Sequence, residues 1–64
     1  MEDLLSRLTE EQTALEHKLE KLIAFNLSDK VNDVDSVQRD ILLIQEKAMS
    51  TYNECLKIRI SRLQ

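Results

Sequence analysis

The second half of the chain carries two stripes of mainly apolar residues along one predicted helix, residues 36–63. The first stripe repeats in alternating steps of four and three and consists of Val37, Ile41, Ile44, Ala48, Thr51, Cys55 and Ile58. The second stripe, displaced by one residue, consists of Leu42, Met49, Tyr52, Leu56, Ile60 and Leu63. A helix that packs on one neighbour needs an apolar face of roughly 100°, and two adjacent stripes make a wider one. We therefore expect part of this helix to contact a second copy of the chain or a partner protein.

A single seam runs along the first half of the chain and predicts a helix over residues 3–25. Its positions alternate in steps of three and four, as in a coiled coil, and are Leu5, Leu8, Gln12, Leu15, Leu19, Leu22 and Asn26. Two of these residues, Gln12 and Asn26, are polar. They either fix the register of the helices from an edge of the core, as polar seam residues often do, or face a cavity or ligand. The pattern leaves both interpretations open.

Residues 26–35 interrupt the helical pattern without glycine or proline. Their Ser, Asp and Asn side chains bond nearby backbone amides and so favour turns and helix caps. We expect a short helical turn here whose Val31 and Val34 pack against the core, with Asp33 or Asp35 as the N-cap of the second helix. The predicted fold class is all-α, a single domain over residues 1–64 built as an antiparallel hairpin of two long helices.

Chain length favours assembly into an oligomer. A chain of 64 residues buries only about 60% of its unfolded surface and is marginally stable alone. Proteins of this size usually add disulfides, a metal or oligomerisation. Cys55 is the only cysteine, and neither Cys55 nor His17 stands in a metal-binding spacing. A homo-oligomer is therefore the expected solution.

Charge and motifs exclude several classes of function. The net charge of −3 argues against DNA or RNA as a partner, because phosphate neutralisation needs a basic face. No stretch has the apolar length of a membrane span or the layout of a signal peptide. Together with the lone cysteine, this pattern indicates a reducing cytoplasm. Since no nucleophile–base set and no glycine-rich phosphate loop occur, we expect neither an enzyme nor a bound cofactor.

Two segments resemble a known phage family. The first is KLEKLIAF, residues 18–25, followed by a polar break that contains Ser28, Asp29 and Lys30. The second is LLIQEKAMSTYNECLKIRISRL, residues 42–63. Its matching positions are Leu42, Leu43, Gln45, Ala48, Met49, Tyr52, Leu56, Arg59, Ile60 and Leu63. Both segments are similar to the anti-CBASS cyclic-nucleotide sponges, small helical phage proteins that sequester the signalling nucleotides of bacterial immunity.

The resemblance implies a helical hexamer that binds cyclic dinucleotides between subunits, and in some members cyclic trinucleotides at separate sites, without cleaving them. It implies ligands such as cyclic GMP–AMP and cyclic tri-AMP, and a location in the cytoplasm of the infected bacterial host. In the family, an aromatic residue early in the first helix stacks on a base, and a lysine near the break contacts phosphate. The aromatic position falls at or near Gln12, and Lys30 is the phosphate candidate. Because stacking is worth roughly 1–3 kcal/mol per base, a glutamine there could weaken or redirect dinucleotide binding.

A trinucleotide site would need donors from several chains around a symmetry axis. The donors that the second helix can present are Ser50, Thr51, Asn53, Lys57 and Arg59. Arg59 is the best of them, because its planar fork suits phosphate bidentately. The alternative for each residue is plain solvent exposure, and basic residues near a helix C-terminus are also favoured by the helix dipole.

Two functions from different classes therefore remain. The first is a non-catalytic sponge, a homo-oligomer whose inter-subunit pockets trap cyclic oligonucleotides. The second is a structural or adaptor coiled coil that binds a protein partner, as many proteins with a heptad seam do. The wide double stripe and the polar break favour the sponge.

Overall fold

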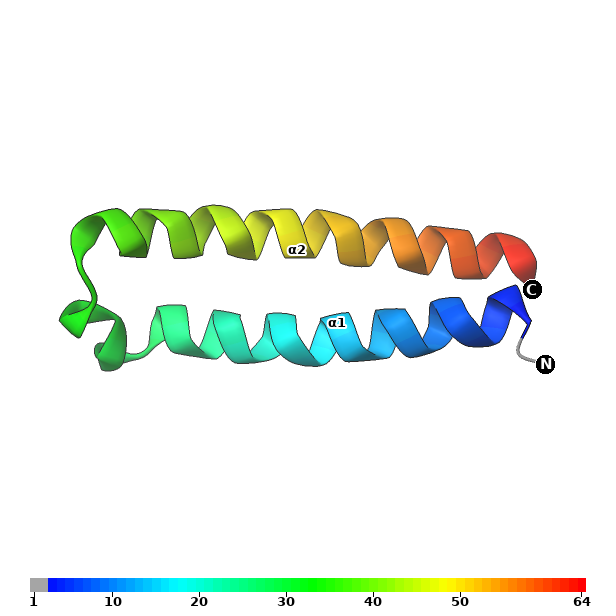
Figure 1. The fold of residues 1–64 in the computed structure, drawn as a ribbon, viewed down its shortest axis with the longest axis horizontal. Helices are drawn as coiled ribbons and strands as arrows, with labels where there is room; N and C mark the ends of the chain where they lie inside the picture. Colours follow the sequence, from blue (N-terminus) through cyan, green and yellow to red (C-terminus); the bar gives the residue numbers. More distant parts are fainter. Residues whose placement is uncertain (1–2) are drawn as a thin grey trace.

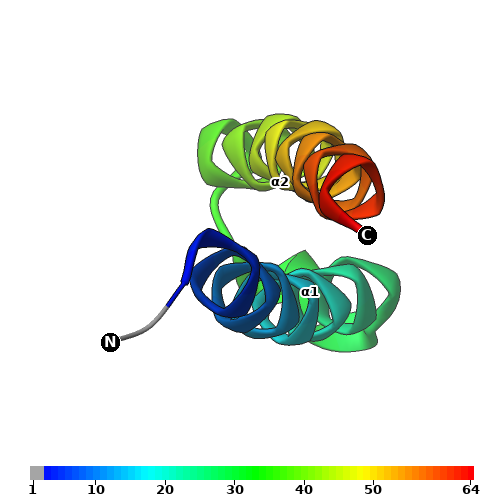
Figure 2. The ribbon, with the colours of Figure 1, turned by 90° about the vertical axis from the view of Figure 1, so that its right-hand side faces the viewer.

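The computed structural model describes residues 3–64 and contains two long helices joined by a short one. Helix α1 spans Leu4–Leu27, the 3-10 helix η1 spans Asp29–Asp33 and helix α2 spans Ser36–Leu63. The two long helices run antiparallel and lie side by side in two perpendicular views, with both ends of the chain at the same end of the molecule (Figures 1 and 2). The molecule measures 45 × 16 × 16 Å. The all-α hairpin expected from the sequence is confirmed.

Short polar side chains set the helix boundaries. At the start of α1, the Asp3 carboxylate accepts a hydrogen bond from the Ser6 backbone N–H at 2.7 Å. At its end, the Ser28 hydroxyl and backbone N–H both donate to the Phe25 carbonyl, which closes the last turn two residues beyond the predicted limit of 25. Asp35 caps α2 by accepting from the Gln38 N–H at 3.3 Å. Of the two candidate caps, Asp33 and Asp35, the structure therefore uses Asp35.

The core is one narrow seam between α1 and α2. Leu8 and Leu19 of α1 and Leu56 of α2 are the buried apolar residues of the described chain, and Leu56 has no exposed surface. Partly buried apolar side chains extend the seam in both directions: Leu5, Leu15, Leu22 and Ile23 on α1, and Leu42, Met49 and Ile60 on α2. One buried residue, Asn53, is polar and is 4% exposed. A core with so few fully buried side chains stabilises a single hairpin only weakly.

The two stripes of α2 lie in different environments. Much of the second stripe faces α1, although Tyr52 and Leu63 remain exposed. The first stripe is exposed along its whole length; its Ile44, for example, retains 66% of its surface. Ile44 and the buried Asn53 are nine residues apart, which is about two and a half helical turns, so the first stripe lies on the side of α2 that faces away from α1. One chain thus leaves this stripe uncovered.

Candidate functional site

A chain of polar contacts crosses the seam between the two helices and includes three of the predicted site residues. The Gln12 side-chain amide donates to the Asn53 carbonyl oxygen at 3.1 Å. The Asn53 amide in turn donates to Glu16 Oε1 at 3.3 Å, and Lys57 Nζ lies 3.1 Å from the same oxygen. We call Gln12, Glu16, Asn53 and Lys57 the polar ladder. It connects α1 to α2 in one register.

Electrostatics within the polar ladder are mutually favourable. The hydrogen bond from the Lys57 ammonium holds the pKa of Glu16 below its usual value of 4.5, and the Asn53 amide lowers it further. The same contact raises the pKa of Lys57 above 10.5. Lys57 also lies 3.9 Å from Glu54 on its own helix. Within one chain, the amides of Gln12 and Asn53 and the ammonium of Lys57 are therefore already engaged.

The other four predicted site residues are exposed, and only two of them, Ser50 and Thr51, are neighbours in the chain. Lys30 lies in η1, and Ser50, Thr51 and Arg59 lie on α2. The Thr51 hydroxyl donates to the Lys47 carbonyl at 3.0 Å, one turn earlier in the same helix. Lys57 and Arg59 are two residues apart, so they point about 200° away from each other around the helix. One copy of α2 does not direct its candidate donors toward a single point.

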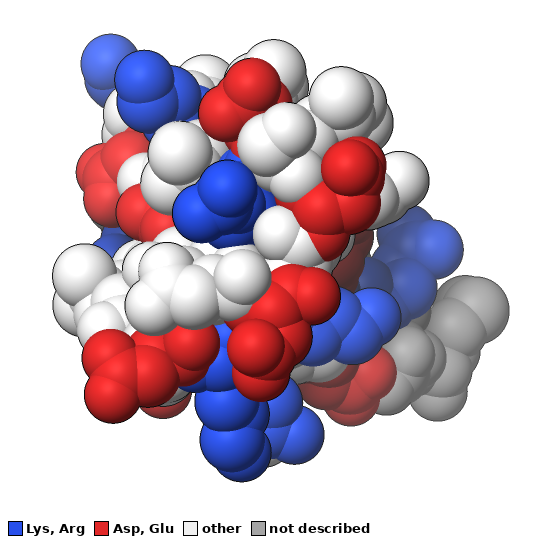
Figure 3. Space-filling model, turned by 90° about the vertical axis from the view of Figure 1, so that its left-hand side faces the viewer, with Lys and Arg blue, Asp and Glu red and all other residues white. Residues whose placement is uncertain are grey.

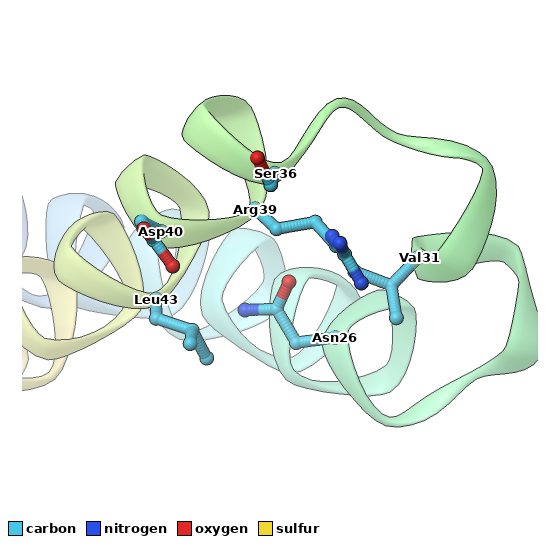
Figure 4. Close-up of a pocket in the computed structure, with 6 residues that line it drawn as sticks. All are labelled: Asn26, Val31, Ser36, Arg39, Asp40 and Leu43. Carbon is cyan, nitrogen blue, oxygen red and sulfur yellow. The ribbon is translucent and has the colours of Figure 1, made fainter.

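A pocket of about 360 Å³ opens where the end of α1 meets η1 and the first turns of α2. Sequence reasoning did not single it out. Its lining residues are Asn26, Val31, Ser36, Arg39, Asp40 and Leu43 (Figure 4). Two buried polar atoms, Asn26 Oδ1 and Arg39 Nε, have no hydrogen-bond partner among the described residues. Both atoms are covered by other atoms of the chain, so a molecule in the pocket would reach them only after these side chains moved.

The Asn26 side chain has a fixed orientation in this pocket. Its Nδ2 donates to Glu46 Oε1 at 2.9 Å and to the Leu42 carbonyl at 3.4 Å. Because both of these partners are acceptors, the amide nitrogen lies on their side and Oδ1 lies on the opposite side. Figure 4 shows this oxygen pointing toward α2, on the side where Arg39 lies. The contacts of the Asn26 nitrogen connect the two helices, as the first of the two interpretations expects, and the cavity or ligand role stays a prediction.

Part of this pocket had a signal in the sequence. Arg39 lies three residues before Leu42, so it continues the seam of α2 by one position toward the N-terminus. A charged residue at a seam position is the same kind of departure as Gln12 and Asn26. Ser36 and Asp40 do not fall at seam positions. They line the pocket because η1 lies next to the first turns of α2.

Other kinds of site find little support in the described residues. Among residues 3–64, no group of three or more His, Cys, Asp and Glu side chains could hold a metal ion, and no helix is long and apolar enough to cross a membrane. Cys55 is a free, exposed cysteine on the first stripe. At the end of the molecule that carries η1, acidic and basic side chains are mixed (Figure 3). This view shows no broad basic face of the kind that nucleic acids require.

The model of the Sequestin family matches residues 2–62, nearly the whole chain. No curated protein and no solved structure matches the chain. The match includes both helices, η1, the polar ladder and the pocket.

Proposed function

The chain belongs to the sequestin family, the anti-CBASS cyclic-nucleotide sponges, and from this premise we propose a specific form of the sponge. Sponge activity against CBASS immunity follows from the family in general terms. In our proposal the protein is a homo-oligomer, a hexamer, that binds cyclic di- or trinucleotides between its subunits in the cytoplasm of the infected host. It lowers the concentration of free messenger without cleaving it, so the effector enzyme is not activated.

The exposed first stripe is the observation that carries this proposal. Seven positions of α2 that repeat at heptad spacing face away from α1, and four of them are the β-branched aliphatic residues Val37, Ile41, Ile44 and Ile58. Water-exposed apolar stripes of this length on small proteins mark interaction surfaces. We therefore propose that a second copy of α2 covers the first stripe.

An antiparallel pair of α2 helices suits the stripe best. With the two-fold axis near Ala48, Ile44 lies opposite Thr51 and Ile41 lies opposite Cys55 of the second copy, while Ala48 meets its own copy and Val37 lies opposite Ile58. Alternation of large and small side chains lets two helices pack without voids. Parallel pairing would instead place each residue opposite its own copy, so that Thr51 and Cys55 as well as Ala48 would face small residues.

Charge also favours the antiparallel arrangement. Residues 55–64 contain three basic residues and no acid, whereas residues 29–40 contain four aspartates and two basic residues. Antiparallel pairing brings the basic end of one α2 toward the acidic end of the other, and it opposes the two helix dipoles. Parallel pairing would bring like ends together, which costs free energy.

Ligand contacts are proposed for the residues that a single chain leaves available. Lys30 would contact a phosphate of a cyclic dinucleotide. Arg59, with Ser50 and Thr51, would contribute to a trinucleotide site only when several copies bring these side chains together. Gln12, Asn53 and Lys57 already have partners in the polar ladder. For these three we propose that the ladder first sets the register of the helices, and that any ligand contact uses their remaining hydrogen-bonding capacity.

Isothermal titration of the purified protein tests the proposal. The ligands are cyclic GMP–AMP and cyclic tri-AMP, with linear AMP as the control ligand. We expect a dissociation constant near nanomolar, about −12 kcal/mol, for at least one cyclic ligand. Lys30→Ala should weaken dinucleotide binding and Arg59→Ala trinucleotide binding, whereas Lys21→Ala, an exposed lysine on α1, should weaken neither. Bound ligand should be recovered chemically intact after the protein is denatured.

Two outcomes would contradict the proposal. A folded, oligomeric protein that binds none of these cyclic ligands would not be a sponge for them. A protein that stays monomeric and binds no ligand would favour the adaptor function, in which the first stripe receives a helix of another protein.

A further inference from the structure

Helix α2 offers two sides on which it could pack against α1, and apolar residues alone do not choose between them. The first stripe contains no charged residue from Val37 to Ile58. The side that faces α1 in the structure is less uniformly apolar, because Arg39, Glu46 and Asn53 lie among its apolar residues and are partly or fully buried. As a coiled-coil seam, the first stripe is therefore at least as suitable as the side that the structure uses.

The connection between the helices does not choose the side either. Residues 28–35 join α1 to α2. A half-turn of α2 about its own axis would move its Cα atoms by about 5 Å, which is twice the helix radius. Since each residue of an extended chain spans up to about 3.5 Å, a connection of this length could follow such a rotation.

Hydrogen bonds from two amides of α1 depend on the observed orientation of α2. Gln12 Nε2 donates to Asn53 Oδ1 at 3.1 Å, and Asn26 Nδ2 donates to Glu46 Oε1 at 2.9 Å. The two acceptors are seven residues apart in α2, so they lie on the same side of the helix. In the opposite orientation the two amides would face the aliphatic first stripe, and a polar group that is buried without a partner destabilises a fold.

We infer that Gln12 and Asn26 select the side of α2 that packs against α1, and that they thereby keep the first stripe free for a second copy. A hairpin that covered the first stripe with its own α1 would lack the surface through which copies assemble. The two amides act against this alternative structure, much as one buried asparagine fixes the pairing of a coiled coil. The consequence for assembly rests on the proposed function, whereas the orientation of α2 can be tested without it.

The native Cys55 can report this orientation, because it lies on the first stripe and is exposed in the single chain. The variant Gln12→Leu/Asn26→Leu completes the leucine seam of α1 and removes the donors to Asn53 and Glu46. N-ethylmaleimide should alkylate Cys55 roughly tenfold more slowly in this variant than in wild type, since one unpaired buried group shifts an equilibrium by about that factor. The rates are compared at concentrations where both proteins are monomeric, with trimethylamine N-oxide added to stabilise the folded hairpin.

A cysteine on the other side of α2 separates rotation from unfolding. Met49 is partly buried and lies seven residues before Leu56, on the side that faces α1. In a Cys55→Ser background, Met49→Cys should react slowly while the two amides are present and faster once both are leucine. Rotation of α2 therefore changes the two alkylation rates in opposite directions, whereas unfolding would raise both.

Two control proteins are matched to the variant in which both amides are replaced. Adding Glu46→Leu and Asn53→Leu to it makes both facing sides apolar, so the observed orientation and the wild-type reactivity of Cys55 should return. Asn32→Leu/Gln64→Leu makes the same two changes at exposed positions and should behave like wild type. Circular dichroism would confirm that each protein retains its helices.

The outcomes separate this inference from the proposed function. Slower alkylation of Cys55 together with faster alkylation of Met49→Cys supports the inference, and any other pair of rates overturns it, whatever ligand the protein binds. Sedimentation equilibrium of Gln12→Leu/Asn26→Leu then tests the consequence, which is weaker assembly than in wild type. If α2 rotates but assembly is unchanged, the amides do select the orientation, and it is the proposed assembly through the first stripe that is wrong.

Discussion

Truncation of Ile44 to alanine is the most direct test of assembly through the first stripe. Ile44 lies near the middle of this stripe and is 66% exposed in the single chain, so most of its surface is available for burial against a second copy. The substitution does not impair the hairpin itself, because Ile44 faces away from α1 and alanine has a higher helix propensity than isoleucine.

The size of the effect follows from the exposed fraction. Ile44→Ala removes three carbon atoms, and burial of each contributes about 0.8 kcal/mol. About two thirds of that contribution remains to be gained on assembly, which gives roughly 1.6 kcal/mol per copy and roughly 3 kcal/mol per symmetric pair. Since 1.4 kcal/mol corresponds to a tenfold change in a dissociation constant, the dissociation constant of the pair should rise about 200-fold.

Sedimentation equilibrium over a wide range of protein concentration measures this change. Leu27→Ala is the matched control: it also removes three carbons from an exposed residue, 83% exposed, but lies at the end of α1 outside the stripe. An Ile44→Ala protein that assembles with the wild-type dissociation constant would refute the first stripe as the interface. Loss of helical circular dichroism at concentrations where wild type is monomeric would instead refute our view that Ile44 is dispensable for the hairpin.

Two further predictions concern the pairing of α2 and the acid stability of the hairpin. If α2 pairs antiparallel, oxidation of the Ile41→Cys variant should link the new cysteine to the native Cys55 of a second copy and give a dimer on a non-reducing gel. Wild type should form no such dimer. A wild-type dimer linked through Cys55 would indicate parallel pairing. The pKa of Glu16 is depressed below 4.5 by Lys57, so the stability that this carboxylate adds is present above pH 4.5 and is lost as the pH falls through the lowered pKa. Urea unfolding at pH 7 and pH 3 should show a smaller acid loss in Glu16→Gln than in wild type or in Glu20→Gln, an exposed control on α1; equal losses in all three proteins would contradict it.

The hairpin could be predicted because α1 carries a single apolar seam, so only one side of this helix can face α2. Its leucines repeat at heptad spacing, and the break after it contains residues that favour turns. The second helix was harder, since it carries two stripes and periodicity does not say which one faces α1. Only the relative rotation of the two helices decides this, and that rotation depends on packing around Leu56 and on the polar ladder.

The polar seam residues show where sequence reasoning stops. Gln12 was expected either to fix register or to face a ligand, and its partner, Asn53, lies 41 positions later in the chain. No local pattern connects two such residues. The pocket was missed for a related reason: Ser36 and Asp40 line it because of the path of η1, which depends on hydrogen bonds within the break rather than on periodicity.

Folding and ligand binding are coupled in the proposed assembly, because the same helix serves both. On the side of α2 that faces α1, only Leu56 and Asn53 are fully buried. The polar ladder on this side fixes the register of the two helices and adds little to the stability of the hairpin. The side that faces away from α1 holds the aliphatic surface that a second copy would bury. A hairpin with so small a core gains much of its stability from assembly. At protein concentrations where the chain is well folded, it is then also assembled, and the pockets between subunits are formed. A ligand that binds only between subunits must therefore raise both the stability of the oligomer and the helix content of the chain.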